Sequence, residues 1–340
     1  MLVSTNRPLA AVYDLALVDL DGVTYRGPEP IDHAATALTG ARAEGMGLLF
    51  VTNNASREPE AVAGQLTSLG IAAAPHEVMT AAQAAAAVLR DGLEPGAKVL
   101  VIGGAGLVTA TRAAGFEVVT SADDDPVAVV QGFSPDLGWR ELAEAAYAVA
   151  RGAWHVASNR DLTLPNERGL APGNGALVAA VVAATGQEPV SAGKPGATMF
   201  HLAAQRAGAS NPLVVGDRLD TDLAGARAAG YPGLHVFTGV SSARDAVLAA
   251  APERPSFLGA DLRALHTAHP EPRPAPDGWW TCHAAAARVV GGRLELAGRE
   301  NGVDAVRAAC AAAWTATDAG TPVDPDSVPD FRADPAVDDA

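Results

Sequence analysis

Cysteine is scarce in this chain of 340 residues, which has only Cys282 and Cys310. Two cysteines are too few for a disulfide framework or a zinc site. No apolar run approaches membrane-spanning length without a charge, glycine or proline. The first twenty residues lack the charged start, apolar core and cleavage pattern of an export signal. We therefore expect a cytoplasmic protein that does not insert into a membrane.

Positive charge is also in short supply. The formal net charge is −15 and the pI is about 4.9. Nucleic acid binding needs a basic footprint, so this class of function is excluded. If the substrate is an anion, its binding site must contain local positive charge, supplied by a metal ion or by a single lysine positioned there.

Apolar residues, by contrast, make up 49% of the chain, and the mean hydropathy is +0.12. This is ample for globular cores, and the length predicts two or three domains. From residue 13 to 120, short apolar strands alternate with helices. Such alternation is the signature of a doubly wound parallel sheet, and the predicted fold class is therefore α/β.

The most informative stretch is an apolar strand at 13–19 that ends on two carboxylates, Asp19 and Asp21, followed by Gly22. Side chains two apart point to one side of an extended segment. The two carboxylates should therefore leave the carboxyl end of the strand together, where open α/β sheets bind ligands. Two such groups repel each other, so a cation or a proton is expected between them.

Other apolar strands of the same block also end in polar groups. The strand at 48–52 ends in Thr52 and Asn53, the strand at 212–215 is followed by Asp217, Asp220 and Asp222, and Lys194 lies in a Gly-Lys-Pro turn between them. In a parallel sheet all these ends meet on one edge. Together they supply what phosphoryl transfer needs: carboxylates for Mg²⁺, a point-charge cation, hydroxyl and N–H donors, and a carboxylate nucleophile.

A glycine-rich turn at 103–106 offers an alternative, a dinucleotide site, with acidic residues at 123–125 about twenty positions on. However, Thr109 occupies the third glycine position, and the acids lie beyond the end of the next strand. The pattern therefore argues against a nicotinamide or flavin cofactor.

Four segments in order resemble the motifs of the haloacid dehalogenase superfamily of aspartate-nucleophile phosphatases: 19–23, 51–56, 193–195 and 215–222. The resemblance covers about 10–265. The 140 positions from Asn54 to Lys194 resemble the branch with a large α/β cap, and this implies a core at 10–80 and 187–268 and a cap at 81–186. Residues 277–319 add a small ββα extension with a hairpin turn at Gly291-Gly292, and 320–340 reads as disorder.

The resemblance also implies a role for each matching residue. Asp19 would be the nucleophile that becomes phospho-aspartate, and Asp21 the acid and base that also binds Mg²⁺. Asp217 would be a metal ligand, Asp222 an acid behind the metal shell, and Lys194 a charge-offsetting catalytic group. The phosphoryl oxygens would be held by Thr52, Asn53 and Asn54. Asp220 reads as a bystander, and the cap-loop residues Asn159 and Asp161 are candidates for the non-phosphate end of the substrate.

Residues 163–170 and the extension resemble glycerol 3-phosphate phosphatases, which implies glycerol 3-phosphate as the substrate and a place in glycerophospholipid metabolism. Two alternatives stay open: a phosphatase for another small ester, such as phosphoglycolate or a sugar or nucleoside monophosphate, and a ligand-sensing protein with a vestigial site. Caps of this branch often pair, so a homodimer is expected.

Overall fold

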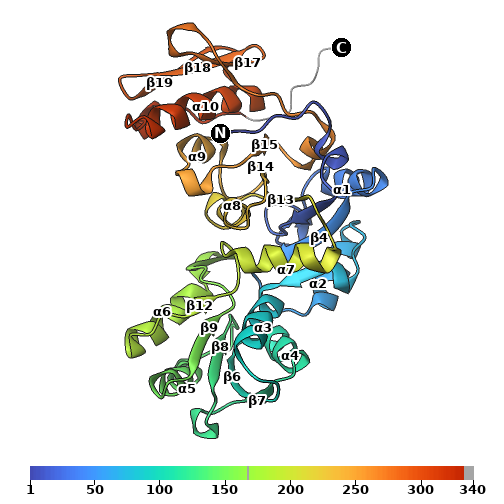
Figure 1. Ribbon diagram of the computed structural model, residues 1–340, viewed down its shortest axis with the longest axis vertical. Helices are drawn as coiled ribbons and strands as arrows, with labels where there is room; N and C mark the ends of the chain where they lie inside the picture. The colour runs from blue at the N-terminus through green and yellow to red at the C-terminus, as the bar shows by residue number, and fades with distance from the viewer. Residues whose placement is uncertain (167, 333–340) are drawn as a thin grey trace. The chain divides into compact units, whose positions relative to one another are not determined.

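The computed structural model describes residues 1–166 and 168–332 (Figure 1). The chain forms two compact units, one from Met1–Leu48 and Arg206–Ala340 and one from Leu49–Gln205. The division falls within a strand and near the end of a helix, so it differs from the expected core and cap boundaries, which remain a proposal. None of the helices in the described ranges is both long and apolar enough to cross a membrane.

The first unit is built on parallel strands in the order β15-β14-β13-β1. All four residues of β1 (Leu15–Val18) and all five of β13 (Pro212–Gly216) are buried, as expected for strands covered on both faces. The other elements before the extension are η1 Leu9–Ala11, β2 Tyr25–Arg26, β3 Glu29–Pro30, α1 Ala34–Ala43, η4 Leu219–Leu223, α8 Ala224–Ala228, β14 Gly233–Val236, α9 Ala243–Leu248, η5 Ala251–Glu253, β15 Phe257–Gly259 and η6 Leu262–His266.

The second unit contains a five-stranded parallel sheet in the order β12-β9-β8-β6-β7, and β4 (Gly47–Thr52) pairs in parallel with β5 (Val78–Thr80). Parallel sheets flanked by helices confirm the predicted α/β class. The remaining elements are α2 Pro59–Ser68, η2 Pro75–Glu77, α3 Ala81–Gly92, β6 Lys98–Ile102, α4 Ala105–Ala113, β7 Glu117–Val119, η3 Ala122–Asp124, β8 Ala128–Gln131, α5 Trp139–Ala150, β9 Trp154–Ala157, β10 Thr163–Asn166, β11 Gly169–Pro172, α6 Asn174–Thr185, β12 Val190–Ser191 and α7 Ala197–Ala207.

The glycine turn at 103–106 serves packing in this unit. A Cβ on Gly106 would lie 2.6 Å from the carbonyl oxygen of Arg57, and one on Gly104 would lie 2.9 Å from the Cβ of Ser56. These glycines therefore let the start of α4 approach the loop that follows β4. Their presence needs no dinucleotide.

The carboxyl-terminal extension is larger than the expected ββα unit. It is a four-stranded antiparallel sheet in the order β16-β17-β18-β19, packed on the helix α10 (Val303–Asp318). The predicted Gly291-Gly292 turn joins β18 (Ala285–Val290) to β19 (Arg293–Gly298). A second hairpin turn at His283 separates β17 (Trp280–Cys282) from β18, and the sheet is completed by β16 Arg273–Pro274, which the 3₁₀ turn η7 Pro276–Gly278 follows.

One face of α10 packs on the α/β part of the same unit. The indole N–H of Trp314 donates to the carbonyl of Ala246 in α9, and the Arg254 guanidinium lies 5.3 Å from the Trp314 ring centroid. Cys282 and Cys310 are both buried free thiols in this shared core. The extension is thus continuous with the core of its unit.

The expected disorder of 320–340 is wrong for residues 320–332. Val323 and Val328 are buried against α10, and Arg244 donates to the carbonyls of Pro325 and Val328 around the turn η8 (Pro325–Ser327). The acidic and proline-rich composition of this segment predicted a solvated tail. In the structure, Val323 and Val328 anchor the segment in the core that contains α10. Residues 333–340 lie outside the described part of the chain.

Candidate active site

In the first unit, the ends of β1 and β13 bring the predicted metal-binding aspartates together. The register pairs Val18 with Val215, and the N–H of Asp19 donates to the carbonyl of Val215 over 2.9 Å. Asp19 and Asp217 therefore leave neighbouring strands at the same level. Asp222 joins them from η4, a single π-helical turn of the kind often found at functional sites.

Asp19, Asp217 and Asp222 each offer a carboxylate oxygen, and these oxygens lie within 4.8 Å of one another. Asp217 and Asp222 are each only 1% exposed. Three carboxylates this close need a cation to offset their repulsion. Oxygen ligands of this type and number suit Mg²⁺, which keeps several water or substrate oxygens in its shell. The donor set therefore fits the expected ion.

Small residues make room for Asp217. A Cβ on Gly239 would lie 1.8 Å from Asp217 Oδ2, and one on Gly22 would lie 2.4 Å from the same atom. The N–H of Val240 donates to this oxygen over 2.6 Å. Position 22 requires glycine for two reasons. A side chain there would clash with Asp217, and the backbone φ of +82° is one that other residues adopt only at a cost.

Asp21 is exposed and lies in the turn stabilised by the Gly22 N–H, which donates to the Tyr25 carbonyl. The Thr238 hydroxyl donates to the Gly22 carbonyl over 2.6 Å, so the loop after β14 fixes this turn. Asp220 lies outside the three-aspartate cluster. It forms an ion pair with Arg218 at 2.7 Å, in keeping with the bystander reading.

Sequence reasoning missed the supporting role of His235. This histidine is buried in the core, and its Nε2 contacts the carbonyls of Asp217 and Ser241 at 3.2 and 3.1 Å. The ring therefore ties together the two loops beside the aspartate cluster. The partners of His235 are main-chain carbonyls on other segments, so no sequence motif predicts the contact. Burial lowers the pKa of His235 to about 4.

This pKa predicts a loss of stability in acid. Between pH 6.5 and pH 4 the unfolded chain takes up a proton at this histidine and the folded chain does not, so the free energy of unfolding falls as the pH falls. The contribution of His235 reaches about 3 kcal/mol near pH 4. Urea unfolding at pH 7 and pH 4.5 measures it, with His235→Asn as the comparison. An equal pH dependence in the variant would remove His235 as the cause.

In the second unit, the residues after β4 form a hydrogen-bonded network with the predicted cap residues. Asn53 Oδ1 accepts from the N–H of Lys194 over 2.8 Å, and Asn53 Nδ2 donates to both carboxylate oxygens of Asp161 at 3.1 and 3.0 Å. Asn159 Nδ2 donates to the Asn53 carbonyl over 2.7 Å. The structure thus brings together Asn53, Asn159, Asp161 and Lys194.

The Lys194 side chain is 4% exposed, and its ammonium donates to the Val51 carbonyl over 3.3 Å. A buried ammonium is costly unless it meets an anion or strong acceptors, so this position favours negatively charged neighbours. A Cβ on Gly193 would lie 2.5 Å from the Ser158 carbonyl, so this position also requires glycine. Thr52 ends β4, and Asn54 lies in the loop that follows, where its Oδ1 accepts from the N–H and the hydroxyl of Ser56.

Comparisons with known proteins identify the families that parts of this chain match. Residues 16–117 match the haloacid dehalogenase-like hydrolase family, and residues 191–265 match a related HAD-hydrolase-like family. Residues 282–338 match the GCN5-related N-acetyltransferase like domain.

Among curated proteins, the D-glycerol 3-phosphate phosphatase of Mycobacterium tuberculosis is 44% identical over 314 residues, which cover 91% of this chain and 88% of that protein. An acid sugar phosphatase of Staphylococcus aureus is 38% identical over 235 residues, 68% of this chain and 90% of that protein. The crystal structure of the glycerol phosphate phosphatase from M. tuberculosis in complex with magnesium has a TM-score of 0.83, at 44% identity, and covers 91% of this chain and 92% of that one.

Proposed function

This chain belongs to the haloacid dehalogenase-like hydrolase family and is a phosphomonoester hydrolase, and we propose that its substrate is glycerol 3-phosphate. One observation carries the choice of substrate. The similarity to the D-glycerol 3-phosphate phosphatase extends over 91% of the chain, whereas the similarity to the acid sugar phosphatase of S. aureus covers only 68%.

We propose that Mg²⁺ is bound by Asp19 and Asp217, with Asp222 and the main-chain carbonyl of Asp21 completing the protein side of the site. The clustered carboxylates support this assignment, as does the magnesium complex of the similar phosphatase. When bound, the ion offsets the charge of the phosphoryl group and of the attacking carboxylate.

The chemistry proposed for the side chains has two steps. Asp19 attacks phosphorus, and the bond between phosphorus and the glycerol oxygen breaks as Asp21 gives that oxygen a proton. Asp21 then takes a proton from a water molecule, which attacks the phospho-aspartate. The bond between phosphorus and Asp19 breaks, and inorganic phosphate leaves.

The hydrogen-bonded group of Asn53, Asn159, Asp161 and Lys194, here named the Lys194 cluster, is proposed to act on the same phosphoryl group. Its buried ammonium would supply local positive charge to the substrate in a chain whose net charge is −15. Thr52, Asn53 and Asn54 would donate to phosphoryl oxygens from the loop after β4. Because Asn53 holds Asp161 and Asn159 by hydrogen bonds, the proposal places these cap residues next to the substrate's glycerol end.

A phosphate-release assay over a panel of small esters tests the substrate. We expect kcat/KM for glycerol 3-phosphate to exceed that for phosphoglycolate, sugar phosphates and nucleoside monophosphates by at least about tenfold, a modest difference in transition-state binding. A higher value for another ester would replace the substrate and leave the phosphatase assignment intact. No turnover of any ester with Mg²⁺ would support the ligand-sensing alternative.

We also propose that the protein is a cytoplasmic homodimer. The cap segment leaves large apolar side chains exposed, Leu162 by 67% and Leu170 by 76%, and such groups favour association. Two buried free thiols suit a reducing compartment. A single-chain mass at micromolar concentration in sedimentation velocity would refute the dimer, and recovery of the protein outside the cytosolic fraction would refute the location.

A further inference from the structure

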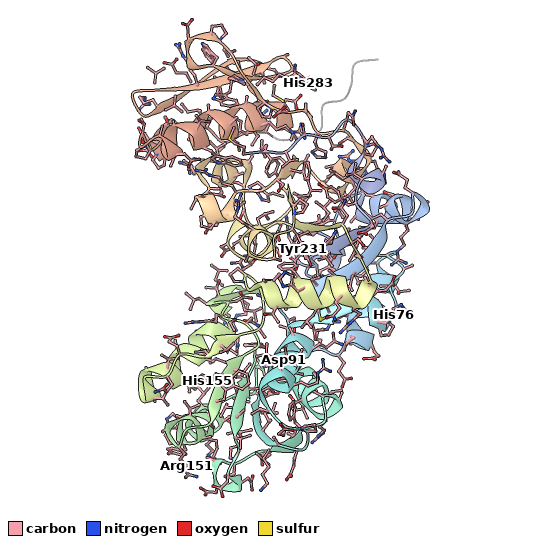
Figure 2. The ribbon with its side chains drawn as sticks, in the orientation of Figure 1. His76, Asp91, Arg151, His155, Tyr231 and His283 are labelled. Atoms are coloured by element: carbon pink, nitrogen blue, oxygen red, sulfur yellow. The ribbon has the colours of Figure 1, made fainter. Side chains whose placement is uncertain are left out.

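The extension contains a second group of metal-ligating side chains, away from the aspartate cluster in sequence and in kind. Cys282 ends β17, His283 occupies the turn that follows, and Asp304 lies in the first turn of α10. Sulfur, nitrogen and oxygen atoms of the three side chains lie within 4.8 Å of one another. Figure 2 labels His283 at this position on the extension.

Asp304 is held in place as a ligand would be. Its Oδ1 accepts from Arg307 Nη1 over 2.6 Å, and Arg307 is fixed in turn by donating to the Leu258 carbonyl over 2.9 Å. Asp304 Oδ2 faces His283 Nδ1 at 2.7 Å, and Cys282 Sγ lies 3.5 Å from Oδ1. A carboxylate oriented by a neighbour on one oxygen and presenting the other is the usual arrangement at metal sites.

His283 lies in the tight hairpin turn between β17 and β18, and its φ of +48° is of the kind that such turns use. The turn places the imidazole, which is largely exposed, beside Asp304.

We propose that Cys282, His283 and Asp304 bind Zn²⁺. Thiolate, imidazole and carboxylate form a donor set that Zn²⁺ prefers and Mg²⁺ does not. On binding, the Cys282 thiol loses its proton to solvent, and the ion takes the place of the hydrogen between His283 and Asp304. The two cysteines alone did not predict such a site, because only the fold brings Asp304 of α10 to Cys282 and His283.

The three protein ligands leave a fourth position for water. His283 and Asp304 both line a cavity of about 360 Å³ between the extension and the loop after β15, which is also lined by Arg263, Arg299 and Arg307. Asp261, which also lines the cavity and pairs with Arg263, and Asp304, which pairs with Arg307, offset much of the positive charge of these guanidinium groups. Arg307 also competes with a cation for Asp304. The open position faces this polar cavity, which leaves room there for water.

Titration of the metal-free full-length protein with Co²⁺, in a phosphine reductant, tests the proposal. We expect a thiolate-to-cobalt charge-transfer band that saturates at one ion per chain. The aspartate cluster cannot produce this band, because it contains no sulfur. Addition of Zn²⁺ should abolish the band, since Zn²⁺ binds such sites more tightly than Co²⁺, while an excess of Mg²⁺ should leave it.

Two variants locate the site. Cys282→Ser should remove the band, and Cys310→Ser, which alters the other buried thiol, should keep it. His283→Ala changes an exposed side chain and should weaken Co²⁺ binding at least about tenfold. Circular dichroism and phosphatase activity establish that each variant is folded. Absence of the band in the natural protein, or its retention in Cys282→Ser, would overturn the proposal.

Discussion

Replacing Asp19 by Asn should reduce turnover of glycerol 3-phosphate and of p-nitrophenyl phosphate by about four orders of magnitude or more, as losses of other covalent nucleophiles do. The amide cannot attack phosphorus to form the proposed covalent intermediate. Phosphate release with Mg²⁺ at saturating substrate measures the effect. The variant should fold, because Asp19 lies beside two buried carboxylates and its removal relieves repulsion.

Asp220→Asn provides the matched control. Asp220 lies near the same loop but pairs with Arg218 outside the aspartate cluster, so its loss should leave kcat nearly unchanged. Thermal unfolding of both variants separates a chemical effect from a structural one. Substantial turnover by folded Asp19→Asn would disprove the nucleophile assignment. Equal losses of activity in the two variants would show that the loss comes from reduced stability and not from the chemistry of Asp19.

Replacing Lys194 by Met should lower kcat by about two to three orders of magnitude. Methionine keeps the length and apolar stem of the side chain but removes the ammonium. If this charge stabilises the phosphoryl group during transfer, kcat falls more than KM rises, since the interaction strengthens in the transition state. Steady-state kinetics with glycerol 3-phosphate gives both constants.

Lys98→Met is the comparison, because Lys98 is an exposed lysine of the same unit, whose ammonium donates to the Asp124 carbonyl. Its replacement should have no effect on either constant. This pair of variants also tests whether the Lys194 cluster and the aspartate cluster serve one phosphoryl group. An unchanged kcat in folded Lys194→Met would separate the two clusters and withdraw that part of the mechanism.

The expected losses of activity are large because the charged side chains concerned are buried or lie beside buried charges. Asp217, Asp222 and Lys194 are all less than 5% exposed, so solvent screens the charge of each of these side chains weakly. Removing a buried charge from its own cluster leaves its neighbours there without compensation. Exposed ion pairs, such as that of Arg151 with Asp123, contribute little to stability, so their loss should have a much smaller effect.

Local sequence predicted the features that depend on a few neighbouring residues. Apolar runs ending in Asp19 and at Asp217 identified buried parallel strands and the carboxylates at their ends, because alternation and burial on both faces are written in the residue types. The Gly291-Gly292 turn and the helix that became α10 were predictable for the same reason.

Tertiary structure decided which distant side chains meet. Trp314 of α10 donates its indole N–H to the carbonyl of Ala246 in α9, and residues 320–332 dock where composition predicted disorder. The network of Asn53 with Asp161 joins positions more than a hundred residues apart.

The sequence by itself thus determined the α/β class, the order of the phosphatase motifs and the carboxylate at each strand end, since these follow from contacts within a strand, a turn or a helix. Only the tertiary structure decided that Asp222 returns to Asp217 through a π-helical turn, and that Cys282 and His283 meet Asp304 across a hairpin and a helix. The physical reason is that such meetings depend on the packing of whole elements against one another, and no local pattern of residues encodes that packing.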